Sequence, residues 1–207
     1  MLDNPGAFLH TFASSAVYTA AADDAATPVI ACIEDGEAWT GINAALRDTV
    51  NLGQVRLGRA WLLPDALPAA PAFGDTIEQL GRTWTVQDSW PEGDMLVLGL
   101  AQGALVVAVT VQRDQQVSDG ALGYKTVPVD IWSGRAAVHG LSGRERVLAA
   151  RTVGVGIRTG WMAACPDLAP GCSIVTPHER LHVTSAYTDH DRGWTIWEAE
   201  ARQEGQS

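Results

Sequence analysis

The chain has 207 residues, of which 46% are hydrophobic and 18% charged, and its formal net charge is −10. This composition is typical of a globular protein and excludes a disordered or fibrous chain. Residues 1–103 carry 13 acidic and 4 basic groups (net −9), whereas residues 104–207 carry 11 acidic and 10 basic groups (net −1). The acidic first half disfavours nonspecific phosphate binding and leaves two explanations, solubility or a basic protein partner.

The cysteines and the N-terminus predict a soluble protein. Cys32, Cys165 and Cys172 form neither a disulfide framework nor a zinc motif, because their number is odd and no CxxC occurs. We expect reduced, mostly buried thiols. Residues 1–22 lack the basic start of a signal peptide, and no apolar run is long enough to span a bilayer. The protein is therefore expected to stay inside the cell that makes it, or in an assembly built there.

The first half is predicted to start with a helix and continue as strands. Asn4-Pro5 is a good helix start, and helical spacing of apolar residues suggests a helix to about Ala21. The segment 41–52 is either a loop or a helical turn, and the prolines of 64–71 predict a surface crossing. Apolar and alternating runs predict strands at 28–33, 54–63, 76–77, 82–90 and 95–98.

The second half is predicted to follow the same order after a boundary at Gln102-Gly103. The polar stretch 115–123 is expected to be a long turn, and 140–152 a charged excursion. Pro128 is placed at an edge or a bulge of one bent strand or two. Strands are predicted at 105–112, 125–138, 153–157, 173–174, 180–187 and 194–197.

A pattern that occurs twice supports two related modules. A Gly-led turn, a short strand and a second alternating strand occur at 73–90 and again at 170–187. The matched pairs are Ile77 with Ile174, Trp84 with Leu181, Val86 with Val183, and Trp90 with Tyr187. We therefore predict an all-β fold with two small β-barrel or sandwich domains in tandem, residues 1–102 and 103–207, and a short N-terminal helix.

The sequence offers little catalytic or metal-binding machinery. The candidate metal ligands are His178, His182, Asp189, His190 and Asp191, but the β pattern does not put the first two on one helical face. No nucleophile elbow, phosphate-binding loop or dinucleotide fingerprint occurs. We expect no metal, no cofactor and no enzymatic activity.

Two groups of residues are candidates for interaction. Trp39, Trp90 and Trp194 lie near predicted turns or strand ends, where interface use competes with partial burial. The excursion and the strand after it carry Arg144, Glu145, Arg146, Arg151 and Arg158. Arginine suits desolvated ion pairs, so a subunit or partner contact competes with an ordinary solvated hairpin.

Several short motifs resemble phage head-tail connector proteins. The second half resembles the head-closure (stopper or adaptor) family in Val109–Arg113, Ile131-Trp132, Leu141–Glu145, Val155–Arg158 and Arg180–Tyr187. The first half is similar to the lambda-type head-tail joining protein, with an N-terminal helix, a central strand pair and the run from Gly74 to Val86. Together the two resemblances cover most of the chain, although such proteins are usually single modules.

The resemblance implies a structural protein of the virion neck, assembled in the host cytoplasm. It implies a homo-oligomeric ring between the portal or adaptor and the tail tube or tail terminator, with genomic DNA passing through the lumen and no membrane contact. Six or twelve copies are expected, and six would present twelve similar modules. The 140–152 excursion corresponds to a loop that can project toward the channel, where its arginines would bind neighbouring subunits or DNA.

Two alternatives remain open at this point. A carbohydrate-binding or tail-associated β module would use exposed tryptophans as stacking platforms. A hydrolase with an unrecognised site is the third hypothesis.

Overall fold

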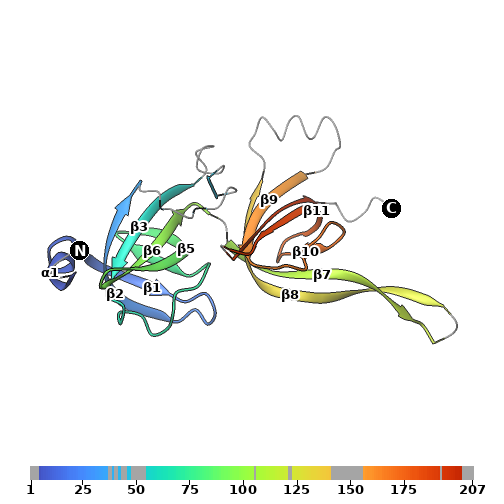
Figure 1. Ribbon diagram of the computed structural model, residues 1–207, viewed down its shortest axis with the longest axis horizontal. Helices are drawn as coiled ribbons and strands as arrows, with labels where there is room; N and C mark the ends of the chain where they lie inside the picture. Colours follow the sequence, from blue (N-terminus) through green and yellow to red (C-terminus); the bar gives the residue numbers. More distant parts are fainter. Residues whose placement is uncertain are drawn as a thin grey trace. The chain divides into compact units, whose positions relative to one another are not determined.

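The computed structural model describes residues 5–36, 39, 42, 46–47, 55–104, 106–120, 123–140, 156–191 and 193–201 (Figure 1). The chain divides into two compact units, residues 1–104 and 105–207. The break lies two residues after the Gln102-Gly103 boundary expected from the sequence. Each unit is a six-stranded antiparallel sheet, which confirms an all-β fold with two tandem domains.

The first unit is a closed barrel preceded by a helix. Its strands follow the order β1-β2-β3-β6-β5-β4, and pairing of β1 with β4 closes the sheet. The elements are α1 (Pro5–Phe12), β1 (Ser14–Thr19), β2 (Ala26–Asp35), β3 (Arg56–Leu62), β4 (Thr76–Gln79), β5 (Arg82–Glu92) and β6 (Met95–Gln102). The segment 41–52 lies mostly outside the described residues.

The predicted extension of the first helix to Ala21 is wrong. Helix α1 ends at Phe12, and β1 begins two residues later. Val17, Tyr18 and Thr19 are β-branched or aromatic, and they fit a pleated sheet better than a helix. Strand β1 pairs with both β2 and β4, so a helix here would remove the strand that closes the barrel.

Helix α1 is held to the barrel by a small apolar cluster. Leu9 is buried against Cys32 of β2 and Met95 of β6, and Phe8, Ala13 and Trp61 pack around them. One face of the helix is thus covered, whereas Phe12 near its end is 66% exposed.

The second unit repeats this barrel. Its strand order is β10-β11-β12-β9-β8-β7, and pairing of β10 with β7 closes the sheet. The elements are β7 (Val106–Ser118), β8 (Tyr124–Gly140), β9 (Gly156–Ala163), β10 (Ser173–Val175), β11 (Arg180–Asp189) and β12 (Trp194–Ala201). The predicted excursion 140–152 and the first residues of the predicted strand 153–157 lie outside the described residues, apart from Gly140, which ends β8.

The strand connections are the same in both units. Read from β1 or from β7, the neighbours around each barrel are the first, second, third, sixth, fifth and fourth strands. Trp61 of β3 pairs with Val97, and Trp161 of β9 pairs with Ile196 at the corresponding place. The two halves thus share one topology in addition to the order of their parts.

The repeated sequence pattern has the same backbone geometry in both copies. Gly74 donates to the Val86 carbonyl (3.0 Å), and Gly171 donates to the Val183 carbonyl (3.1 Å). Both glycines have φ of +92°, a conformation that favours glycine. A register shift follows Val86 in β5 and Val183 in β11. All of these pairs are 97 positions apart.

The long polar turn predicted at 115–123 is also wrong. Strand β7 continues to Ser118 and pairs residue by residue with β8, from Gln112 opposite Asp130 to Ser118 opposite Tyr124. Beyond Ser118, the Asp119 amide donates to the Gly123 carbonyl (3.0 Å) and the Asp119 carboxylate accepts from the Gly123 amide (2.9 Å). Figure 1 shows β7 and β8 leaving the barrel as a long two-stranded ribbon.

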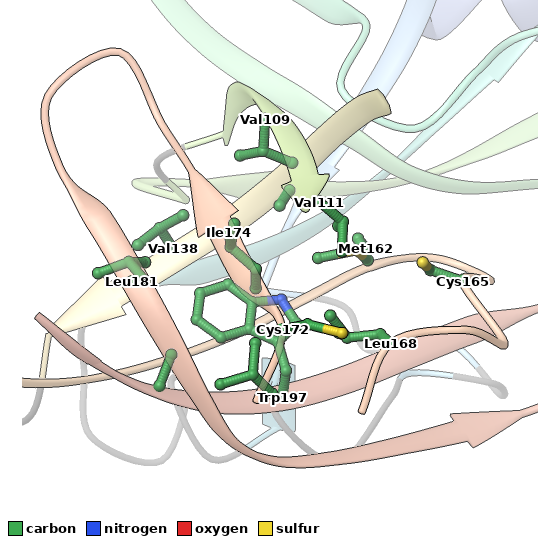
Figure 2. Packing of buried hydrophobic residues seen from close by; sticks show 13 residues of the cluster. Val109, Val111, Val138, Met162, Cys165, Leu168, Cys172, Ile174, Leu181 and Trp197 are labelled. Atoms are coloured by element: carbon green, nitrogen blue, oxygen red, sulfur yellow. The ribbon is translucent and has the colours of Figure 1, made fainter. Parts of the chain in front are cut away.

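Each barrel has its own apolar interior. In the second unit, Trp197 is 1% exposed and lies among Ile174, Leu181 and Met162 (Figure 2). In the first unit, the corresponding cluster contains Ile77 and Trp84. All three cysteines are free and buried, as the sequence predicted.

Candidate functional site

Of the five candidate residues in the arginine-rich segment and the strand after it, the structure describes Arg158. Arg144, Glu145, Arg146 and Arg151 lie outside the described residues. Arg158 of β9 is half-buried and forms a two-pronged ion pair with Glu179, with Nε–Oε1 at 3.0 Å and Nη2–Oε2 at 3.2 Å. The Thr176 hydroxyl oxygen accepts a hydrogen bond from the Glu179 amide (2.9 Å) and so helps to place that carboxylate. Arg158 therefore joins β9 to the β10–β11 turn within its own unit.

The three candidate tryptophans are largely covered by their own units. Trp39 is 6% exposed and Trp194 is 8% exposed, whereas Trp90 is half-buried. Trp39 stacks on Trp90 with ring centroids 6.4 Å apart, and a Cβ added at Gly99 would lie 2.6 Å from the Trp39 ring. The interface role of these tryptophans stays a prediction. The exposed aromatic side chains among the described residues are Phe12, Tyr124 and Tyr187.

The buried carboxylate of Asp75 accepts hydrogen bonds from groups of its own unit, the first. Asp75 is 3% exposed and accepts hydrogen bonds from the Tyr18 hydroxyl, the Ala21 amide (2.7 Å) and the Ala72 amide (2.7 Å). Burial, together with the neighbouring Asp75, raises the pKa of Tyr18 well above its usual value, so the phenol keeps its proton and donates. This arrangement ties β1 and the loop before β4 together, and it is structural.

The half-buried carboxylate of Asp88 lies beside Trp39. Burial raises the pKa of Asp88, and the Ser89 amide (2.8 Å) and the Trp39 indole oppose that rise. Asp88 follows the register shift in β5 and lies two residues before Trp90, which stacks on Trp39.

Among the described residues of the second unit, His139 is a buried titratable group with a shifted pKa and an open hydrogen-bonding position. It is 8% exposed and stacks on Trp161 with centroids 4.9 Å apart. Its Nε2 has no hydrogen-bond partner within the described part of the chain. Burial lowers the pKa of His139, because the imidazolium would lose its hydration.

This burial predicts that the second unit becomes less stable in mild acid. The unfolded chain binds a proton at His139 near pH 6.5, whereas the folded chain resists protonation until a lower pH. Stability should therefore fall as the pH drops below 6.5. In His139→Phe, which keeps an aromatic ring on Trp161, urea midpoints measured from pH 7.5 to 5 should fall less steeply. An unchanged slope would contradict this assignment.

Two exposed features remain after these groups are accounted for. The sequence predicted a strand at 125–138, which includes one side of the first feature, but it predicted neither the paired ribbon nor the second feature. The first is the ribbon formed by Arg113–Ser118 and Tyr124–Asp130, in which nearly every residue is exposed. This segment is called the arm below. Val117, together with the alternating Val127 and Val129 of the predicted strand 125–138, was the signal that could have revealed the pairing.

The second feature is an apolar groove on the first unit, with a volume of about 650 Å³. It is called the α1 groove below. It lies between α1, the β1–β2 hairpin and the segment after β3, and its lining includes Leu9, Ala16, Val29, Ile30, Leu63 and Asp65. Ile30 is 51% exposed and Leu63 is 38% exposed, so apolar surface faces solvent here.

The described residues contain no group of three His, Cys, Asp or Glu side chains arranged to hold a metal ion. They also contain no helix that is long and apolar enough to cross a membrane.

The comparisons with known proteins identify no family. Neither a protein-family model nor a curated protein matches this chain. Among solved structures, the chain is similar to the solution structure of protein SF1141 from Shigella flexneri 2a. The identity is 18% and the TM-score 0.40, with 49% of this chain and 96% of that chain covered. At that level the similarity carries no conclusion about function.

Proposed function

We propose that this chain is a structural head-tail connector protein of a tailed bacteriophage. In this proposal it forms a homo-oligomeric ring between the portal or adaptor and the tail tube or tail terminator, and it performs no chemistry. The observation that carries the proposal is the pair of barrels with one topology, each containing the motif that resembles a connector family. The exposed arm and the α1 groove provide surfaces that such an assembly could use.

The two units differ in ways that suit different neighbours. The first half carries a net charge of −9 and the second a net charge of −1. An acidic wall would let DNA slide through a ring, because strong phosphate binding needs clustered Lys and Arg. The arginines of 140–152 would contact a neighbouring subunit or DNA.

Removing residues 141–150 tests the proposal. The deletion removes no residue of the described strands, so the purified protein should keep its β-sheet circular dichroism. Phage that carry the deletion should make heads that leak DNA or fail to join tails, whereas complementation with the full chain should restore joined particles. Normal particle yield from the deletion would argue against a channel role for this segment. Failure of the full chain to co-purify with portal or tail tube would argue against the connector function itself.

A carbohydrate-binding module is the second candidate, and exposed aromatic side chains are the observation that favours it. Tyr124 is 75% exposed and Tyr187 is 66% exposed. Binding of the isolated protein to a glycan array, lost in Tyr124→Ala or Tyr187→Ala, would support this candidate over the connector.

A further inference from the structure

The two units share a topology, but each carries one addition that the other lacks among the described residues. The first unit has helix α1, which forms one wall of the α1 groove. The second unit has the arm. Strand β1 ends at Thr19, its last pair with β4, whereas β7 continues for six residues past Gln112, its last pair with β10. The arm is therefore an insertion relative to the first barrel.

The arm has one apolar face and one acidic face. Side chains alternate along β7, so Arg113, Gln115 and Val117 continue the face that holds Val111 in the barrel interior. Their partners on β8 are Val129, Val127 and Lys125. The Arg113 guanidinium donates to the Asp167 carbonyl (2.6 Å), next to Leu168 of the interior cluster, which agrees with this direction. The two basic residues and the three valines thus lie on one face, called the valine face below.

The opposite face of the arm carries the acidic side chains. Asp114 and Asp130 belong to the alternate set of positions, and the side-chain amide of Gln112 (Nε2) donates to the Asp130 carboxylate (2.7 Å) on that side. The valine face is therefore apolar with positive charge, although the arm as a whole contains acidic residues.

A two-stranded ribbon without a covering layer is marginally stable in water. Val117 is 41% exposed and Val129 is 37% exposed, so the rest of the second unit does not cover the valine face. A matching surface would be apolar with negative charge. The α1 groove is apolar, carries exposed Asp65, and belongs to the half of the chain with net charge −9.

We propose that the arm of one copy of this chain docks its valine face in the α1 groove of a second copy. Val117 and its neighbours then cover Ile30 and Leu63, and Lys125 faces the acidic rim at Asp65. The contact joins two different surfaces, so it is head-to-tail, and each copy keeps a free arm or a free groove for the next. The inference deepens the proposed function, because a ring needs such a contact, but its test requires only purified protein.

The test uses one substitution on each surface, and both positions are exposed. Val117→Glu puts a carboxylate opposite Lys125 on the valine face, where it removes an apolar contact and competes with Asp65 for that cation, and Leu63→Glu puts a carboxylate in the groove. The wild-type chain should sediment as oligomers. Each variant should sediment as a monomer, because burying a carboxylate in place of an apolar side chain should weaken the contact at least about 100-fold.

Mixing the two variants tests whether these two surfaces are partners. The Val117→Glu chain keeps an intact groove and the Leu63→Glu chain keeps an intact arm, so an equimolar mixture can form one good contact. Sedimentation velocity should show a dimer and nothing larger. A mixture that stays monomeric would overturn the proposal, as would a monomeric wild-type chain or oligomers of either single variant.

Two matched controls separate the contact from a general effect of charge. Gln116→Glu alters the opposite face of the same arm, and Leu80→Glu alters the 87% exposed residue of the β4–β5 turn. Both should sediment like the wild-type chain. Monomers from both controls would overturn the proposal, because an added carboxylate would then prevent association wherever it lies on the chain. If the wild-type chain is monomeric yet co-purifies with portal or tail tube, the arm contact fails and the connector function survives.

Discussion

Asp75→Ala should destabilise the first unit by about 3–5 kcal/mol. The substitution removes a 3% exposed carboxylate that accepts from the Tyr18 hydroxyl and from the Ala21 and Ala72 amides. Three donors would be left without their partner, and a buried donor that loses its partner costs about 1–3 kcal/mol. Such a loss is a large part of the stability of a domain of this size.

Hydrogen exchange measured by mass spectrometry can separate the two units. Peptides from β1, β4 and β5 should lose protection in Asp75→Ala, and peptides from β10–β12 should keep it. Glu78→Ala changes an exposed carboxylate on neighbouring β4 and should shift stability by less than about 0.5 kcal/mol. Equal protection in Asp75→Ala and the wild-type chain would show that Asp75 does not hold the barrel together.

Gly160→Ala should destabilise the second unit by about 3 kcal/mol, at the upper end of overpacking effects. A Cβ at this position would lie 2.0 Å from the Ala137 carbonyl oxygen and 2.4 Å from the Trp197 ring. The Ala137 oxygen belongs to paired strand β8, and Trp197 is 1% exposed in the core, so neither can move freely. The barrel must distort to accept one methyl group.

Gly156→Ala, four residues earlier in the same strand, is the matched control. Among the described residues, its Cβ would meet Arg158 at 3.5 Å and Ala201 at 3.8 Å, which are ordinary contacts. A Gly to Ala change without strain stabilises by about 0.4–1 kcal/mol, because it restricts the unfolded chain. Urea unfolding of both variants should therefore give shifts of opposite sign. A Gly160→Ala midpoint at or above that of Gly156→Ala would contradict the packing argument.

The repeat was readable in the sequence because its spacing is local and chemically specific. A glycine with φ of +92° and two paired apolar positions are needed to make each turn, and these residues recur 97 positions later. The order of the elements along each half follows from similar local patterns, and the free thiols were expected because the number of cysteines is odd and no CxxC occurs. The fold class could thus be predicted without coordinates.

The two wrong predictions, the helix to Ala21 and the turn at 115–123, lie where the local preference of a segment differs from the strand pairing that it adopts in the folded chain. The segment after Phe12 has helical spacing of apolar residues, but two neighbouring strands recruit it as β1. The polar residues 115–118 resemble a turn, but β8 extends beside them and pairs with each one. Periodicity in one segment carries no information about which distant segment supplies its hydrogen bonds.

The sequence predicted the candidate site less well than it predicted the fold class and the repeat. Arg158 was visible as one of several arginines, but its commitment to Glu179 depends on β9 and the β10–β11 turn lying side by side. Trp39 was placed near a turn, whereas packing over Gly99 buries it. The sequence by itself determined two related all-β modules and their unequal charge, because composition and short-range spacing encode both. Only the tertiary structure decided which side chains are covered and which, on the arm and in the α1 groove, are left exposed. Exposure depends on contacts between segments far apart in the chain.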